Sequence, residues 1–96
     1  MTAKPIHPGE ILADELIELG VTPAALARQI EVPANRINQI IHGKRAITGD
    51  TALRLGRWFG MDAQFWMNLQ ALYEIEIVPS PVRERIDRLP TRAQAA

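Results

Sequence analysis

The sequence contains no cysteine, which excludes disulfide bonds, a thiol nucleophile and a zinc–thiolate site. No apolar run approaches the roughly 20 residues that a membrane-spanning helix needs, and the polar, proline-containing start is unlike a signal peptide. A cytoplasmic location is the simplest expectation. One serine (Ser80) and two histidines (His7, His42) give no basis for a catalytic triad or a zinc-ligand spacing. A glycine-rich phosphate loop is also missing. We therefore expect no enzyme activity, no metal and no cofactor.

The length and composition indicate one small globular domain. Ninety-six residues are enough for a single domain with short tails. The apolar fraction of 47% and the charged fraction of 23% are ordinary values for globular proteins. Disorder of the whole chain is therefore not expected.

Charge is distributed unevenly, although the formal net charge is zero. Residues 1–35 carry a net charge of −3, residues 36–57 a net charge of +4, and residues 58–96 a net charge of −1. A phosphate backbone responds to the local field, so the basic middle segment is the part suited to nucleic acid. The zero total limits indiscriminate DNA binding.

Apolar residues recur at helical spacing, which predicts an all-α fold. Capping residues and glycine or proline stops place five short helices at about residues 8–20, 22–30, 34–42, 48–60 and 62–73. The fifth helix is expected to bury the apolar side formed by Phe65, Trp66, Leu69, Leu72 and Tyr73. All five aromatic residues of the chain lie between Trp58 and Tyr73, where core packing is the expected role.

The expected organisation is an N-terminal arm at residues 1–7, a helix-turn-helix domain at 8–78 and a partly disordered extension at 79–96. Residues 75–78 fit either a fraying helix end or a short extended segment. Ser80 and Pro81 open a last helix that runs to about Leu89, and residues 91–96 are expected to form a disordered tail.

Residues 22–42 have the pattern of a helix-turn-helix: two short helices joined by a three-residue turn. The small Ala27 lets the helices approach, Val32 fills the turn, and Ile37 anchors the second helix. The remaining face of that helix carries amide side chains and one arginine, which can form paired hydrogen bonds to adenine and guanine. Two competing interpretations are an ordinary solvated surface and a helical hairpin that binds only another protein.

Four motifs resemble, in order, the HigA group of antitoxins within the XRE-type, Cro/repressor-like family. They are HPGE at 7–10, VPANRINQIIHGKRAIT at 32–48, DTALRL at 50–55 with WFG at 58–60, and FWMNLQ at 65–70. The resemblance covers roughly residues 5–75 and implies a five-helix repressor-like domain. It also implies a homodimeric antitoxin that neutralises a RelE-like (HigB-type) mRNA-cleaving toxin and represses its own operon. The alternative within the family is a stand-alone regulator with no toxin.

The resemblance also assigns contacts with operator DNA. Base-reading positions fall on the helix face made of Ala34, Asn35, Arg36, Asn38 and Gln39. Phosphate-contact positions fall on Thr22, His42, Lys44, Arg45 and Thr48. Two residues depart from the family pattern: Glu31 replaces a glycine in the turn, and Pro33 replaces a capping serine. The first must adopt or avoid a positive φ, and the second provides no capping hydroxyl.

Two further surfaces are candidates for protein partners. The first predicted helix carries an acidic stripe of Glu10, Asp14, Glu15 and Glu18, which is either a solvated face or a surface for a basic toxin. Beyond the compact domain lie the apolar residues Ile75, Ile77, Val82, Ile86 and Leu89. These either cover the core or form a dimer or toxin surface.

Overall fold

The computed structural model describes residues 4–95, which form seven α-helices and no strand. The helices are α1 (Pro8–Leu19), α2 (Pro23–Gln29), α3 (Ala34–Ile41), α4 (Gly49–Phe59), α5 (Ala63–Glu76), α6 (Ser80–Asp87) and α7 (Arg92–Ala95). The predicted all-α fold is confirmed. Residues 1–3 of the expected N-terminal arm, and residue 96 of the expected tail, lie outside the described part. None of the helices in residues 4–95 combines the length and apolar character that a membrane crossing needs.

Local capping chemistry sets the helix limits. Thr22, Thr48 and Asp62 each accept a backbone N–H of the following helix, as the sequence predicted for helices α2, α4 and α5. Gly20 and Gly60 end α1 and α4 in the left-handed conformation. These caps satisfy backbone groups that the helices leave free, so each short helix has a defined start or stop.

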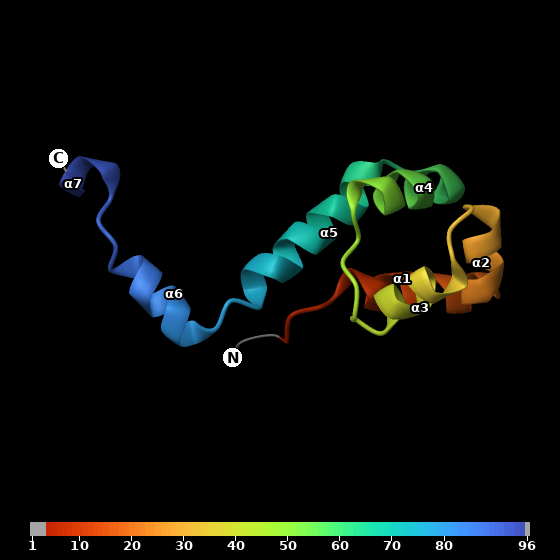
Figure 1. Ribbon diagram of the computed structural model, residues 1–96, viewed down its shortest axis with the longest axis horizontal. Helices are drawn as coiled ribbons and strands as arrows, with labels where there is room; N and C mark the ends of the chain where they lie inside the picture. Colours follow the sequence, from red (N-terminus) through yellow and green to blue (C-terminus); the bar gives the residue numbers. More distant parts are fainter. Residues whose placement is uncertain (1–3, 96) are drawn as a thin grey trace.

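Helices α1 to α5 form the body of the molecule, and α6 and α7 extend away from it (Figure 1). Helix α5 lies against α4 and α1, while α3 lies against α2 and α1. The core is aliphatic apart from one tryptophan, and it consists of Leu12, Leu16, Leu26, Ala27, Ile30, Val32, Ile37, Ile40, Ile47, Ala52, Leu55 and Trp66. The principal dimensions, 54 × 28 × 20 Å, reflect the extended C-terminal arm.

The predicted inner face of α5 is partly wrong. Phe65 and Leu72 are 42% and 56% exposed, whereas Trp66 is fully buried and Tyr73 is half-buried. Helix α5 contacts α4 and α1 along the stripe that contains Trp66, Gln70 and Tyr73, which are spaced four and three residues apart. Phe65 and Leu72 fall beside this stripe, so their side chains remain at the surface.

The C-terminal arm is helical and solvent-exposed. Helix α5 continues to Glu76, so the stretch after Tyr73 is helix and not an extended segment. Arg83 donates hydrogen bonds to the carbonyl groups of Ile75 and Val78, which fixes the bend between α5 and α6.

One helical turn, α7, lies in the tail for which we predicted disorder. Thr91 and Gln94 cap each other: the backbone N–H of each residue donates to the side-chain oxygen of the other. This reciprocal cap is the capping box of a helix start. It supplies partners for the N–H groups of Thr91 and Gln94 at the start of α7, which the sequence analysis did not take into account.

Candidate nucleic-acid interface

Apolar contacts fix the angle between α2 and α3. Ala27 and Ile37 are fully buried, and the backbone N–H of Val32 donates to the carbonyl of Ala27 at 3.0 Å. Glu31 adopts φ 59°, the left-handed conformation that glycine would take without strain. Pro33 occupies the N-cap position of α3 but makes no side-chain hydrogen bond to the helix. The two departures from the family pattern therefore leave a tight turn intact.

Helix α4 supports this turn from outside the hairpin. The guanidinium of Arg54 donates to the carbonyl oxygens of Ile30 at 2.7 Å and Glu31 at 3.3 Å. Trp58 donates to the side-chain amide of Gln29 at 2.6 Å, so a second residue of α4 holds the end of α2. The conformation of the turn thus depends on long-range contacts as well as on its own residues.

Helix α3 presents a polar face to solvent. Ile37 and Ile40 are fully buried, and they orient the helix so that Ala34, Asn35, Asn38 and Gln39 are exposed. Each amide group on this face can donate one hydrogen bond and accept another at the same time, which is the pattern that the edge of adenine requires. Four of the five predicted base-reading side chains therefore lie together on one surface.

The fifth predicted base-reading residue, Arg36, is held at the edge of that face. Its guanidinium lies 3.6 Å from a carboxylate oxygen of Asp50, which also accepts a hydrogen bond from Arg54 at 2.8 Å. The hydrogen bond from Arg54 lowers the pKa of Asp50, and the charge of Arg36 acts in the same direction. A contact between Arg36 and a guanine edge would compete with its ion pair to Asp50.

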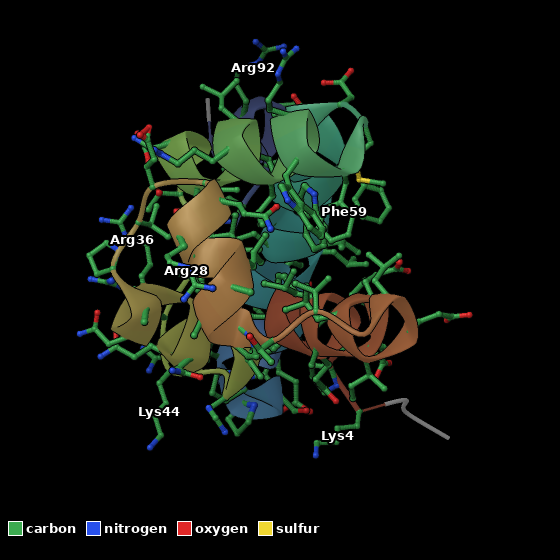
Figure 2. The ribbon with its side chains drawn as sticks, turned by 90° about the vertical axis from the view of Figure 1, so that its right-hand side faces the viewer. Lys4, Arg28, Arg36, Lys44, Phe59 and Arg92 are labelled. Atoms are coloured by element: carbon green, nitrogen blue, oxygen red, sulfur yellow. The ribbon has the colours of Figure 1, made fainter. Side chains whose placement is uncertain are left out.

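All five predicted phosphate-contact side chains are exposed: Thr22, His42, Lys44, Arg45 and Thr48. Figure 2 shows Lys44 extending away from the body of the domain. Thr22 and Thr48 use their hydroxyl oxygens as helix caps. The hydroxyl proton of Thr22 remains for a phosphate oxygen, whereas that of Thr48 is directed to the Thr51 hydroxyl at 3.4 Å. The ring Nδ1 of His42 lies 2.7 Å from the carbonyl of Asn38, an acceptor, so Nδ1 must carry the proton.

The loop after α3 has a defined geometry. The backbone N–H of Gly43 donates to the carbonyl of Ile40, and that of Lys44 donates to the carbonyl of Gln39. With Gly43 at φ 72°, these bonds form a Schellman motif that directs the chain away from the helix axis. Lys44 and Arg45 therefore leave the end of α3 along a fixed path.

Gln70 anchors the far end of this loop, and the sequence analysis missed it. Gln70 is 4% exposed, and its side-chain oxygen accepts the backbone N–H of Ile47 at 2.9 Å. The signal was a single amide on the apolar stripe of α5, four residues after Trp66. A buried amide needs a partner, and this one fixes the loop against α5.

The acidic residues Glu10, Asp14, Glu15 and Glu18 are exposed on α1. Glu10 also completes the capping box of α1, because its carboxylate accepts the backbone N–H of His7 at 3.1 Å. Beside the acidic residues lies a shallow apolar hollow between α1 and the chain around α2 and α3, lined by Ala13, Leu16, Ile17, Val21, Pro23 and Ile41. Ile17 is the most exposed of the large apolar side chains in residues 4–95.

The predicted dimer residues lie apart from the α3 face. All five side chains are exposed along the end of α5 and the C-terminal arm: Ile75, Ile77, Val82, Ile86 and Leu89. Because these side chains are exposed, they do not cover the core of their own chain. Of the two roles considered from the sequence, the dimer or toxin surface is the one that is left.

The chain is similar to proteins of the family described as Helix-turn-helix, whose pattern matches residues 12–66. Virulence-associated protein I of Dichelobacter nodosus is 49% identical over 73 residues, which cover 75% of this chain and 68% of the relative. An addiction module antidote protein of a HigA family from Coxiella burnetii has a TM-score of 0.88 and 43% identity, covering 93% of this chain and 98% of that one. The Pseudomonas aeruginosa antitoxin HigA, solved with the higBA promoter, has a TM-score of 0.85 and 46% identity over the same shares.

Proposed function

This chain belongs to the helix-turn-helix family, in the group of HigA-type antitoxins, and from that membership we propose that it binds operator DNA and represses its own operon. We further propose that it neutralises a RelE-like (HigB-type) mRNA-cleaving toxin. The observation that carries the DNA proposal is the exposed amide-rich face of α3, held outward by the buried Ile37 and Ile40.

In this proposal α3 enters the major groove. Asn35, Asn38 and Gln39 form hydrogen bonds with base edges, and Ala34 contacts a thymine methyl group. Arg36 reads a guanine after leaving Asp50, so its contact is available only where the operator offers a better partner than the carboxylate. Two copies related by a two-fold axis would read half-sites about 10 base pairs, or a multiple of that, apart.

Phosphate contacts come from the borders of the helix-turn-helix. Thr22 and Thr48 lie at the N-termini of α2 and α4, where the helix dipole favours an anion. His42, Lys44 and Arg45 follow α3 directly and are exposed. These contacts would set the register of the protein on DNA and supply most of its salt dependence.

A gel-shift titration of the DNA upstream of the gene, repeated at several salt concentrations, tests the assignment. Asn35→Ala and Gln39→Ala should each cost about 1 to 3 kcal/mol on the specific site and relax specificity. Lys44→Ala should weaken binding to every sequence and reduce the salt slope by about one. Arg57→Ala removes an exposed arginine of α4 outside the assigned contacts and is the matched control. Identical behaviour of all four variants on specific and random DNA would contradict the assignment.

For toxin binding we propose the face of α1 formed by Glu10, Asp14, Glu15 and Glu18, with the adjacent apolar hollow. An RNA-cleaving partner needs basic groups to hold its substrate, and carboxylates suit such a surface by charge complementarity. The hollow beside exposed Ile17 would receive an apolar side chain at the centre of the contact.

Charge reversal tests this surface. The double variant Asp14→Lys with Glu18→Lys should weaken binding of the basic protein encoded beside this gene and leave DNA binding intact. Glu84→Lys with Asp87→Lys makes the same charge change on exposed residues of α6 and is the control. Equal toxin affinity of both double variants would remove the α1 assignment. Failure of the unmodified protein to bind the neighbouring product would favour the stand-alone regulator.

For homodimerisation we propose the arm residues Ile75, Ile77, Val82, Ile86 and Leu89. Isolated apolar side chains at a surface are common, but five along one projecting segment form a patch that a second copy can cover. Deleting residues 79–96 and measuring the mass in solution tests this role. A dimer that becomes a monomer is the expected result, and a deletion variant that remains dimeric would place the interface elsewhere.

A further inference from the structure

His7 lies outside the assigned DNA contacts, yet three elements meet at its ring. The residue is 7% exposed, and it precedes α1 as its N-cap. The ring Nδ1 accepts the backbone N–H of Gly9 at 2.9 Å. The Nδ1 atom therefore carries no proton in this arrangement, because an N–H donor needs a lone pair.

The other sides of the ring contact α5 and the loop after α3. The ring of Tyr73 packs edge-on against it, with centroids 4.8 Å apart. Gly43 lies on another side of the ring, where an added Cβ would make an ordinary van der Waals contact, 3.8 Å from the imidazole Cγ. Burial lowers the pKa of His7, and the carboxylate of Glu10 and the backbone of Arg45 both act against this shift. One imidazole thus joins α1 and α5 to the segment that carries Lys44 and Arg45.

The contact between α1 and α3 next to His7 leaves little freedom of movement. A Cβ built on Gly9 would lie 1.7 Å from the carbonyl oxygen of Ile40, so the start of α1 packs directly on the backbone of α3. Ile40 is also the residue whose carbonyl accepts the N–H of Gly43. The cap made by His7 and the loop therefore share one rigid contact.

We propose that His7 is a positioning residue for DNA binding: its neutral ring fixes the path of the loop that brings Lys44 and Arg45 to phosphate. The effect on phosphate contacts rests on the proposed DNA-binding function, whereas the link between His7 and the loop rests on the contacts described above. The titratable groups that face the ring are Glu10 from α1 and Tyr73 from α5, and the loop contributes the polar backbone of Arg45. Protonation would convert Nδ1 from acceptor to donor and break the cap on Gly9.

His7→Asn separates positioning from simple capping. An Asn side-chain oxygen can replace Nδ1 as the acceptor for the Gly9 N–H, but the side chain is too short to fill the space against Tyr73 and Gly43. Asp62→Ala is the control, because it removes a helix cap at the end of α5 opposite to Tyr73. If His7 acts only as a cap, His7→Asn should behave like the unmodified protein.

The first measurement is the salt dependence of binding to a duplex from upstream of the gene. For His7→Asn we expect affinity about tenfold weaker and a salt slope shallower by about one, the value of one lost phosphate contact. Asp62→Ala should keep the slope of the unmodified protein. An unchanged slope in His7→Asn would overturn the proposal.

The second measurement needs no DNA. In a His42→Gln background His7 is the only histidine, so amide signals that follow its titration report its contacts. We expect the amides of Gly43 and Arg45 to shift together with the His7 ring, and to lose this titration in His7→Asn. If the amide signals of the loop do not change when His7 is titrated, the positioning role is overturned, even where the unmodified protein binds DNA normally. Loop amides that follow it, together with an unmodified protein that binds no DNA, would refute the proposed function instead.

Discussion

Replacing Gly9 with alanine tests how closely α1 and α3 pack. The new methyl group would lie 1.7 Å from the carbonyl oxygen of Ile40, whereas such carbon–oxygen contacts are normally about 3.3 Å or longer. Both groups belong to helix backbones, so the two helices must separate by more than about 1 Å. Overpacking of this kind lowers the free energy of unfolding by about 1 to 3 kcal/mol, and the higher helix propensity of alanine raises it by about 1 kcal/mol. The difference between these two terms is a net loss of up to about 2 kcal/mol.

Urea unfolding measures this loss as a lower midpoint at an unchanged m-value. Gly49→Ala is the matched control, because Gly49 is also a helical glycine and no atom outside its own helix and chain neighbours lies within 4 Å of the Cβ it would gain. That variant should be more stable than the unmodified protein by about 0.4 to 1 kcal/mol. If Gly9→Ala is as stable as Gly49→Ala, the close approach of α1 and α3 is not a real constraint and the reasoning fails.

Three other perturbations have definite expected outcomes. Gln70→Leu leaves the N–H of Ile47 buried without a partner and should cost about 1 to 3 kcal/mol in urea unfolding, so an unchanged midpoint would contradict its anchoring role. Burial lowers the pKa of His7 below 6.5, so the unfolded chain binds the extra proton first. The free energy of unfolding should therefore fall as the pH drops below 6.5, and less so in His7→Asn. Asp50→Asn removes the ion pairs with Arg36 and Arg54 and one negative charge beside the proposed phosphate contacts, so DNA affinity should rise; a decrease would show that Asp50 orients Arg36 for binding.

Those features that depend on neighbouring residues were predictable from the sequence. Thr22 and Asp62 cap helices because a short oxygen-bearing side chain reaches the N–H groups two or three residues ahead. Gly60 ends α4 because glycine enters the left-handed region without strain. Ile37 and Ile40 have the spacing that buries one side of α3, so its opposite face could be assigned before the structure was known.

Features that join distant parts of the chain could not be assigned. Phe65 is as apolar as Trp66, and only the positions of α1 and α4 decide which of the two is buried. Arg36 was placed on the exposed face of α3, but it is only partly exposed because its carboxylate partner lies on another helix. Gln70 hydrogen-bonds a backbone group 23 residues away, and composition and periodicity contain no information about such a bond.

The contacts that Arg54 makes with the carbonyl oxygens of Ile30 and Glu31 mean that the recognition hairpin is not an autonomous unit. A synthetic peptide of residues 22–42 would lack this guanidinium, and Glu31 would have no external support for its left-handed backbone. Grafting only the α3 surface into another scaffold would therefore transfer the side chains without the angle between α2 and α3 that orients them. A transplant that is meant to keep the DNA specificity must bring α4 along with the hairpin.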